Sequence, residues 1–243
     1  DDSLFLYHDV CTNGIGYVDL MFKTDSIAPE QIPYLGLLKS VLGYVDTENY
    51  TYGELFNEIN ANTGGINCGV EVFDRADSTE EFQAMFSVRG KALYTKMDFL
   101  FKMIGEILNS SKLEDTKRLY EIVASVKSRA QVNLTGAGHS TAVLRAAAYS
   151  SPMAAFQDEM AGIGYYQFIE KLEKDFEQRK EETVEELCKL MKKILRPENF
   201  MISYTGERES LETVQKLAGA VKAGLGTEPV EKSEEKLTCT KKN

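Results

Sequence analysis

An apolar helix between a strand and a pair of glycines constrains the fold of this chain more than any other feature. The stretch 33–43 places apolar side chains at helical spacing, and their neighbours widen the stripe around most of the helix: Ile32, Leu35, Leu37, Leu38, Val41 and Leu42. Pro29 can occupy a first helical turn, where its missing N–H costs nothing. The sequence therefore predicts an almost wholly buried helix at the centre of the core.

Strand patterns surround this helix. Residues 4–8 and 17–23 flank Thr12-Asn13-Gly14-Ile15, and Asn-Gly is a strong signal for a tight hairpin, so we expect these two strands to pair antiparallel. Residues 66–72 and 82–88 alternate in polarity and are also expected to pair, across a polar turn at 74–79.

Helical patterns fill most of the remaining chain. Thr51 and Glu54 have the spacing of a capping box and start a helix over 52–61, which Gly64 is expected to end. Helical spacing then continues from Leu93 to Leu195, and a strand at 200–204 and a helix at 207–225 follow. We therefore expect an α+β fold, with an antiparallel sheet and helices packed on one face.

The predicted domain covers 1–225, and the polar stretch 226–243 is expected to be a linker or tail toward a following domain. Because the chain starts without Met and leads directly into a strand, we interpret it as a piece of a longer protein.

Charge and composition exclude several functions. The net charge of −10 argues against nucleic acid as a partner, and no apolar run approaches the ~20 residues of a membrane span. The four cysteines are scattered and form no Cys-x-x-Cys pair, which favours a reducing compartment. The two histidines, His8 and His139, lack ligand or catalytic partners at matching spacing. A polar role at a strand end is expected for His8, and a helix-cap or packing role for His139.

An ordered series of motifs resembles a known family. The series comprises Thr12-Asn13-Gly14-Ile15-x-Tyr17, Pro33-Tyr34-Leu35-x-Leu37-Leu38, Tyr52-x-Glu54-Leu55, Thr63-Gly64-Gly65-Ile66, Gly90-Lys91-Ala92-Leu93, Lys127-Ser128-Arg129, Gly138-His139-x-x-Ala142 and Arg145-Ala146. It ends near Tyr204-Thr205-Gly206. Together these motifs resemble the third domain of presequence-protease and falcilysin-type zinc metallopeptidases, which belong to the pitrilysin/insulinase superfamily.

The resemblance implies four related domains in two hinged halves, which close around a chamber for unfolded peptides. In that family the first domain carries the zinc site, an inverted His-x-x-Glu-His on a helix plus a distant Glu. The positions of its two His and its Glu align here with Leu35, Lys39 and Leu38. Leucine offers no ligand and a protonated lysine repels a dication. We therefore assign no catalytic, cofactor-binding or metal residue, and expect zinc to bind the parent enzyme outside this segment. The family's assisting Arg and Tyr belong to the fourth domain and cannot be placed on this chain.

The expected function follows from this resemblance. The chain would be an inactive fragment of a zinc metalloendopeptidase that degrades short unstructured peptides, and would form part of the chamber wall and of the contact between halves. Its partners would be other domains of the same chain and unfolded peptides, with no nucleic acid and no membrane. Two alternatives stay open: a stand-alone peptide- or protein-binding module, and an inactive structural subunit. The expected location is the cytoplasm of a bacterium or the organelle matrix of a eukaryote.

Overall fold

The computed structural model of the chain contains a five-stranded sheet. The structure describes residues 4–76, 78–233, 235 and 237–240. Its strands are β1 (Phe5–Asp9), β2 (Ile15–Lys23), β3 (Ile66–Arg75), β4 (Ser78–Leu93) and β5 (Phe200–Gly206). The strand order is β1-β5-β2-β4-β3, with β1 and β5 parallel and the other neighbours antiparallel. The α+β class is confirmed, and the sheet is mostly antiparallel.

The predicted hairpin of the first two strands is wrong, because β5 lies between them. Ile202 of β5 is opposite Phe5 on one side and Leu20 on the other. The Asn-Gly turn itself does form: Asn13 and Gly14 have φ of 53° and 80°. The turn depends on local residues, whereas the pairing depends on where the alternating apolar side chains of β5 find a core. A correct turn signal therefore does not guarantee a hairpin.

The pairing of β3 with β4 is confirmed. These strands run to Arg75 and Ser78, so the connection is shorter than the polar turn expected at 74–79, of which residue 77 lies outside the described residues.

The helices follow the predicted pattern closely. A 3-10 turn at Pro29–Gln31 leads into α1 (Ile32–Val41), and the capping box of Thr51 and Glu54 starts α2 (Tyr52–Asn62). After α2 it is Gly65, not Gly64, that adopts positive φ. The other α-helices are α3 (Met97–Ser110), α4 (Thr116–Gly136), α5 (Gly138–Ala147), α6 (Pro152–Ala161), α7 (Ile163–Lys174), α8 (Phe176–Ile194) and α9 (Leu211–Ala223). Short 3-10 turns lie at Tyr94–Lys96, Pro197–Asn199 and Arg208–Ser210.

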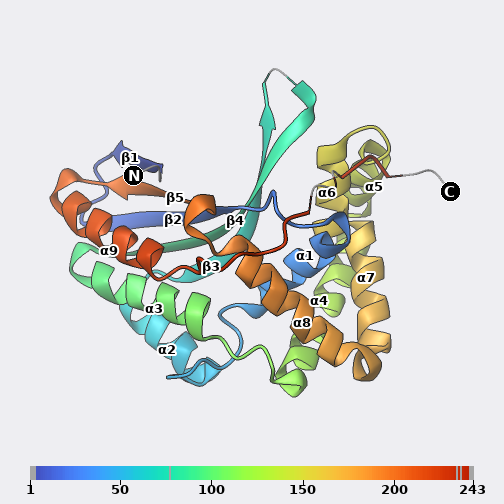
Figure 1. The fold of residues 1–243 in the computed structure, drawn as a ribbon, viewed down its shortest axis with the longest axis horizontal. Coiled ribbons are helices and arrows are strands. Elements are labelled where there is room, and N and C mark those ends of the chain that lie inside the picture. Colours follow the sequence, from blue (N-terminus) through green and yellow to red (C-terminus); the bar gives the residue numbers. More distant parts are fainter. Residues whose placement is uncertain (1–3, 77, 234, 236, 241–243) are drawn as a thin grey trace.

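The helices form two groups around the sheet (Figure 1). In that view α2, α3 and α9 lie below the strands, whereas α1 and α4 to α8 gather beside the sheet on the side of the β3–β4 hairpin. The far end of that hairpin extends away from the other elements. In the described part of the chain, no helix is long and apolar enough to cross a membrane.

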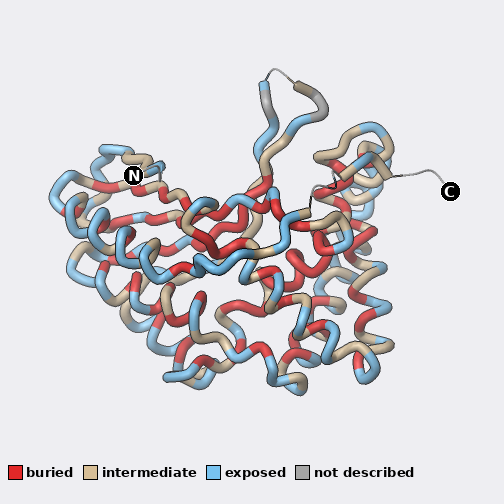
Figure 2. The backbone as a smooth tube through the Cα atoms, viewed as in Figure 1, coloured by how far each residue is buried: buried red, intermediate tan, exposed pale blue. Residues whose placement is uncertain are grey.

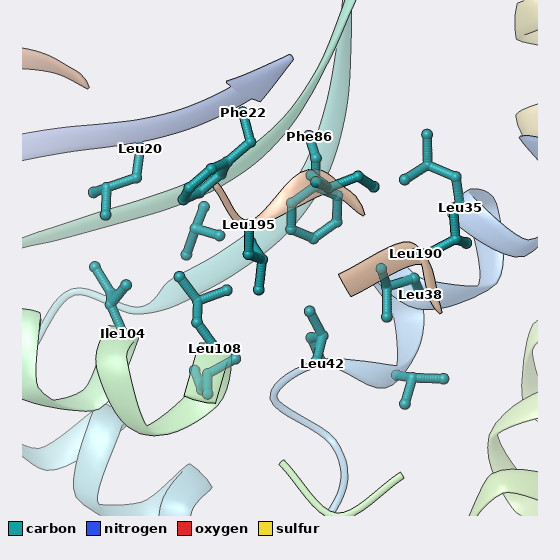
Figure 3. Packing of buried hydrophobic residues seen from close by; sticks show 14 of the residues in the cluster. Leu20, Phe22, Leu35, Leu38, Leu42, Phe86, Ile104, Leu108, Leu190 and Leu195 are labelled. Carbon is teal, nitrogen blue, oxygen red and sulfur yellow. The ribbon is translucent and has the colours of Figure 1, made fainter. Parts of the chain in front are cut away.

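One hydrophobic core joins the sheet to both groups of helices. Figure 2 shows the buried backbone concentrated between these layers. Figure 3 shows side chains of the sheet, of α3, of α1 and of the end of α8 meeting in this core, with the residues just after α1 and α8: Leu20, Phe22, Phe86, Ile104, Leu108, Leu35, Leu38, Leu42, Leu190 and Leu195. The expectation of a nearly wholly buried helix is confirmed, since eight of the ten residues of α1 are buried.

The polar segment after Gly226 contacts the folded body at several described residues. Arg196 Nη1 donates to the carbonyl of Glu228 at 2.6 Å, the amide of Ser233 donates to Ser26 O at 3.1 Å, and the amide of Thr240 donates to Ala148 O at 2.8 Å. Leu237 packs against the core. The described part of this segment is therefore attached to the body at several separate points, although it contains no helix or strand.

Candidate functional site

The side chains of α1 that align with a zinc motif do not fit a metal. Leu35 and Leu38 are 0% and 1% exposed and pack in the core, where they present only carbon. Lys39 lies at the edge of the core and is half-buried, and this burial lowers the pKa of its ammonium group. Among the residues that the structure describes, no three His, Cys, Asp or Glu side chains lie close enough together to hold a metal ion.

The two histidines are far apart in the fold. His8 is an exposed residue of β1, and His139 is exposed in the first turn of α5, on the opposite side of the molecule (Figure 1). The N-cap position of α5 belongs to Ala137, so His139 neither caps the helix nor packs in the core.

A groove next to the sheet lies along the free edge of β3. In the described sheet, β3 is a terminal strand with β4 as its neighbour on one side. A groove of about 580 Å³ follows Gly65 and residues 66–71 of this edge. We call it the β3 groove; the rest of its lining comes from the end of α1 and the loop after it, from α2, and from single residues of α3 and α4: Lys39, Ser40, Leu42, Gly43, Tyr44, Phe56, Ile59, Asn60, Ile107 and Arg129.

Apolar and aromatic side chains line part of the β3 groove. Leu42, Ile59 and Ile107 are buried core residues. Tyr44 and Phe56 are 50% and 56% exposed, which is high for large aromatic side chains in a folded domain. Exposed aromatic rings beside a buried apolar layer are typical of surfaces that bind another chain.

The charged residues of the β3 groove are Lys39, Glu71 and Arg129. The carboxylate of Glu71 is already paired, since its Oε2 lies 3.1 Å from Arg89 Nη2. Within the described residues, neither Lys39 nor Arg129 has a hydrogen-bond or ion-pair partner. The groove is therefore locally cationic in a chain whose net charge is −10.

A second, polar hollow of about 300 Å³ adjoins the β3 groove and shares Gly65 and Asn67 with it. It lies on the face of the sheet that carries Tyr17 and Arg89. Arg89 Nε donates to Asp19 Oδ2 at 2.7 Å, and Lys91 Nζ lies 5.9 Å from the ring centroid of Tyr17. These cations are partnered, unlike those of the groove.

Cys68 lines the β3 groove, and a cysteine thiol can act as a nucleophile. Burial raises the pKa of this thiol to about 12. The thiol is therefore protonated at neutral pH and unreactive, because the thiolate is the nucleophilic form. The β3 groove has a strand edge, an apolar layer and two cations, which are features suited to binding and not to catalysis.

Sequence reasoning singled out Lys39 only as a residue that cannot bind zinc, and it did not identify the groove. One local signal was present. Leu55 and Ile59 form the buried stripe of α2, and Phe56 falls outside it, so a large aromatic residue on the polar side of an amphipathic helix was visible in the sequence.

Comparisons with known proteins identify the family. The family described as peptidase M-16C associated matches residues 1–172. Protein HypA of Clostridium perfringens is 33% identical over 243 residues, which is all of this chain and 25% of that protein. The mitochondrial presequence protease of Yarrowia lipolytica is 29% identical over 168 residues, or 69% of this chain and 17% of that protein. Presequence protease 1, chloroplastic/mitochondrial, of Arabidopsis thaliana is 26% identical over 211 residues, or 87% of this chain and 19% of that protein.

The chain thus spans a quarter or less of the length of these relatives. The predicted resemblance is confirmed: the chain belongs to this peptidase-associated family, a domain that accompanies pitrilysin-superfamily peptidases such as presequence protease.

Proposed function

We propose that this chain is the third, non-catalytic domain of a zinc endopeptidase that degrades short unstructured peptides, and that it forms part of the wall of the peptide chamber. The observation that carries the proposal is the burial of α1: Leu35 and Leu38 fill the core at the positions that a metal-binding relative would use for ligands. The same helix therefore supports the sheet instead of holding an ion. Zinc, with the water that it activates for attack on the peptide bond, would belong to another domain of the parent protein.

In this proposal the β3 groove is the part of the wall that contacts peptides. Its exposed aromatic residues and its strand edge are supporting observations, since extended peptides often bind by adding a strand to a sheet edge. The other domains of the same chain would be its permanent partners. Its location would be the cytoplasm in a bacterium or the organelle matrix in a eukaryote.

Two measurements test this function. The 243-residue chain alone should contain no stoichiometric zinc by mass spectrometry, and should not cleave a quenched fluorescent peptide, whereas the parent protein should cleave it in a chelator-sensitive reaction. Zinc-dependent cleavage by the chain alone, insensitive to a contaminant control, would overturn the proposal. A parent polypeptide without any His-x-x-Glu-His segment would favour a stand-alone binding module or an inactive subunit instead.

The wall itself is tested by crosslinking in the parent protein. A photo-reactive residue placed at Phe56 should label a trapped peptide substrate. The same residue at Tyr120, which is also exposed (42%) but lies on α4 outside the β3 groove, is the matched control. Equal labelling at both positions, or none at Phe56, would contradict a role of the groove in the chamber.

A further inference from the structure

We propose that the β3 groove binds an extended peptide as an added strand on β3 and selects peptides with an acidic side chain, which Lys39 and Arg129 contact. This inference rests on the proposed function and names the class of peptide that the groove prefers. It runs against the overall composition, because an acidic chain would be expected to attract basic peptides.

The strand edge supplies the backbone part of this recognition. In an antiparallel ladder the N–H and C=O groups of a terminal strand point alternately toward its neighbour and toward the free side. Residues 66–71 of β3 pair with β4 and line the groove on the other side. Their free backbone groups can therefore pair with a peptide, independently of its sequence.

The two cations supply the selection. Lys39 is half-buried, so its ammonium group has lost part of its hydration, and it gains no hydrogen-bond or ion-pair partner among the described residues. Arg129 presents a planar set of donors that matches a carboxylate. Because Glu71 is held by Arg89, no carboxylate of the groove lining neutralises either cation. An incoming carboxylate recovers the interaction that Lys39 lacks.

The geometry of a paired strand favours a side-chain carboxylate over a terminal one. Side chains of a strand point alternately to the two faces of the sheet. Lys39 and Arg129 come from α1 and α4, whose apolar residues share one core with Cys68 and Val70 of β3, so every second side chain of the added strand points to the face of the sheet that these helices cover. A C-terminal carboxylate would instead continue in line with the backbone.

Fluorescence anisotropy with the 243-residue chain tests the inference. The probe is a short unstructured peptide with an acetylated N-terminus, an amidated C-terminus and a central Glu; its matched forms carry Gln or Lys there. We expect the Glu form to bind about tenfold more tightly than the Gln form, as a charge contact with the half-buried Lys39 and a second one with the exposed Arg129 allow. The double variant Lys39→Met, Arg129→Gln should remove this preference. Lys216→Met, an exposed lysine of α9 outside the groove, should keep it.

The Met substitution keeps the apolar stem of Lys39, and the Glu-to-Gln change lies in the peptide, so misfolding of a variant cannot imitate the result. Equal affinity for the Glu and Gln forms overturns the inference, and so does an undiminished preference in the double variant. A neutral peptide with a free C-terminus that binds as tightly as the Glu form would assign the cations to a terminal carboxylate. Two further peptides are N-methylated at alternate residues, one at the odd positions and the other at the even positions. Only alternate amides of an added strand donate to β3, so one of these two peptides should lose binding. If neither loses binding, strand addition is wrong.

The outcomes distinguish a failure of this inference from a failure of the proposed function. Binding that is independent of peptide charge but weakened by Phe56→Ala would leave a peptide-contacting wall and overturn the acidic preference alone. No binding of any of the peptides would overturn both.

Discussion

Glu207 connects three segments that are distant in the sequence. Its Oε2 accepts a hydrogen bond from Tyr94 Oη at 2.7 Å and from the amide of Gly14 at 3.3 Å, and its Oε1 accepts from Cys11 Sγ at 3.3 Å. Tyr94 Oη in turn accepts from the amide of Glu207 at 2.7 Å. These contacts fix the turn between β1 and β2 to the end of β5, which is the strand inserted between them.

We expect Glu207→Gln to make stability less dependent on pH. The hydrogen bond from Tyr94, followed by that from Cys11, lowers the pKa of Glu207 in the folded chain. A lowered folded pKa means that the stabilisation is complete above the unfolded pKa of about 4.3 and is lost as pH falls through the folded value. The variant should therefore unfold more easily than the parent at neutral pH, and the difference should shrink below about pH 4.

Urea unfolding of both proteins between neutral and acidic pH measures this effect. Tyr94→Phe, which removes the principal donor, should show the same trend in weaker form. A constant difference between parent and Glu207→Gln across the whole range would show that the carboxylate does not titrate as the geometry requires.

Residue-scale predictions succeeded where partners are close in sequence. The capping box of Thr51 and Glu54 spans three residues and was visible directly, and so was the Asn-Gly turn. The role of Glu207 was not visible, because Tyr94 and Gly14 are 113 and 193 residues away in the chain. A carboxylate just beyond a strand has many other uses, so only the fold identifies its partners.

At the scale of elements, α1 is held by close contact with its neighbours as well as by its leucines. Gly36 lies where α1 meets α6 and α7, and a Cβ added there would be 2.6 Å from the carbonyl oxygen of Met160 and 2.8 Å from the ring of Tyr165. Backbone cannot rotate out of the way as a long side chain can. This glycine therefore sets the distance between the helices.

Gly36→Ala should destabilise the chain although alanine is the better helix former. Overpacking against a fixed carbonyl costs about 1–3 kcal/mol, which exceeds the gain of about 1 kcal/mol in helix propensity. Gly105→Ala in α3 is the matched control, since nothing lies within 4 Å of its added Cβ, and it should stabilise by about 0.5–1 kcal/mol. Chemical denaturation of both variants gives the comparison. Stabilisation by Gly36→Ala would mean that α1 and α6 are farther apart than described.

The elements themselves were largely predictable, and their pairing was less so. The spacing of Leu35 and Leu38 predicted α1, and the alternation in residues 66–72 predicted β3, because each pattern is local. The place of β5 between β1 and β2 was not predictable, since Phe200 and Ile202 would fit beside several strands. Which strand they join depends on the surfaces that remain open after the other elements pack.

At the scale of the whole molecule, the candidate site exists only once these elements are assembled. Lys39, Phe56 and Arg129 belong to three different helices, and the edge they face is free because β3 is last in the strand order. No sequence spacing links them, so the groove could not be derived from the sequence. The ordered series of family motifs predicted the family, but did not indicate this surface.

The segment after Gly226 raises a question about the extent of the folded unit. We propose 1–225 as the domain, as the sequence suggested, because the core of sheet and helices is complete at Leu225. The following residues add contacts at separate points: Glu228 with Arg196, Ser233 with Ser26, Leu237 with the core, and Thr240 with Ala148.

Truncation after Leu225 should therefore leave a chain that unfolds cooperatively but is less stable by about 1–2 kcal/mol, since it loses a half-buried leucine and a few hydrogen bonds. Leu237→Ala should account for about 1 kcal/mol of that loss, because leucine burial there is partial. Glu231→Ala, an exposed position of the same segment, should change the free energy of unfolding by less than about 0.5 kcal/mol. Urea titrations of the four proteins decide between the possibilities. Equal stability after truncation would mean that the segment does not stay bound to the folded body. If the truncated chain no longer unfolds in a single cooperative transition, the core depends on residues that follow Leu225, and the domain boundary lies beyond that residue.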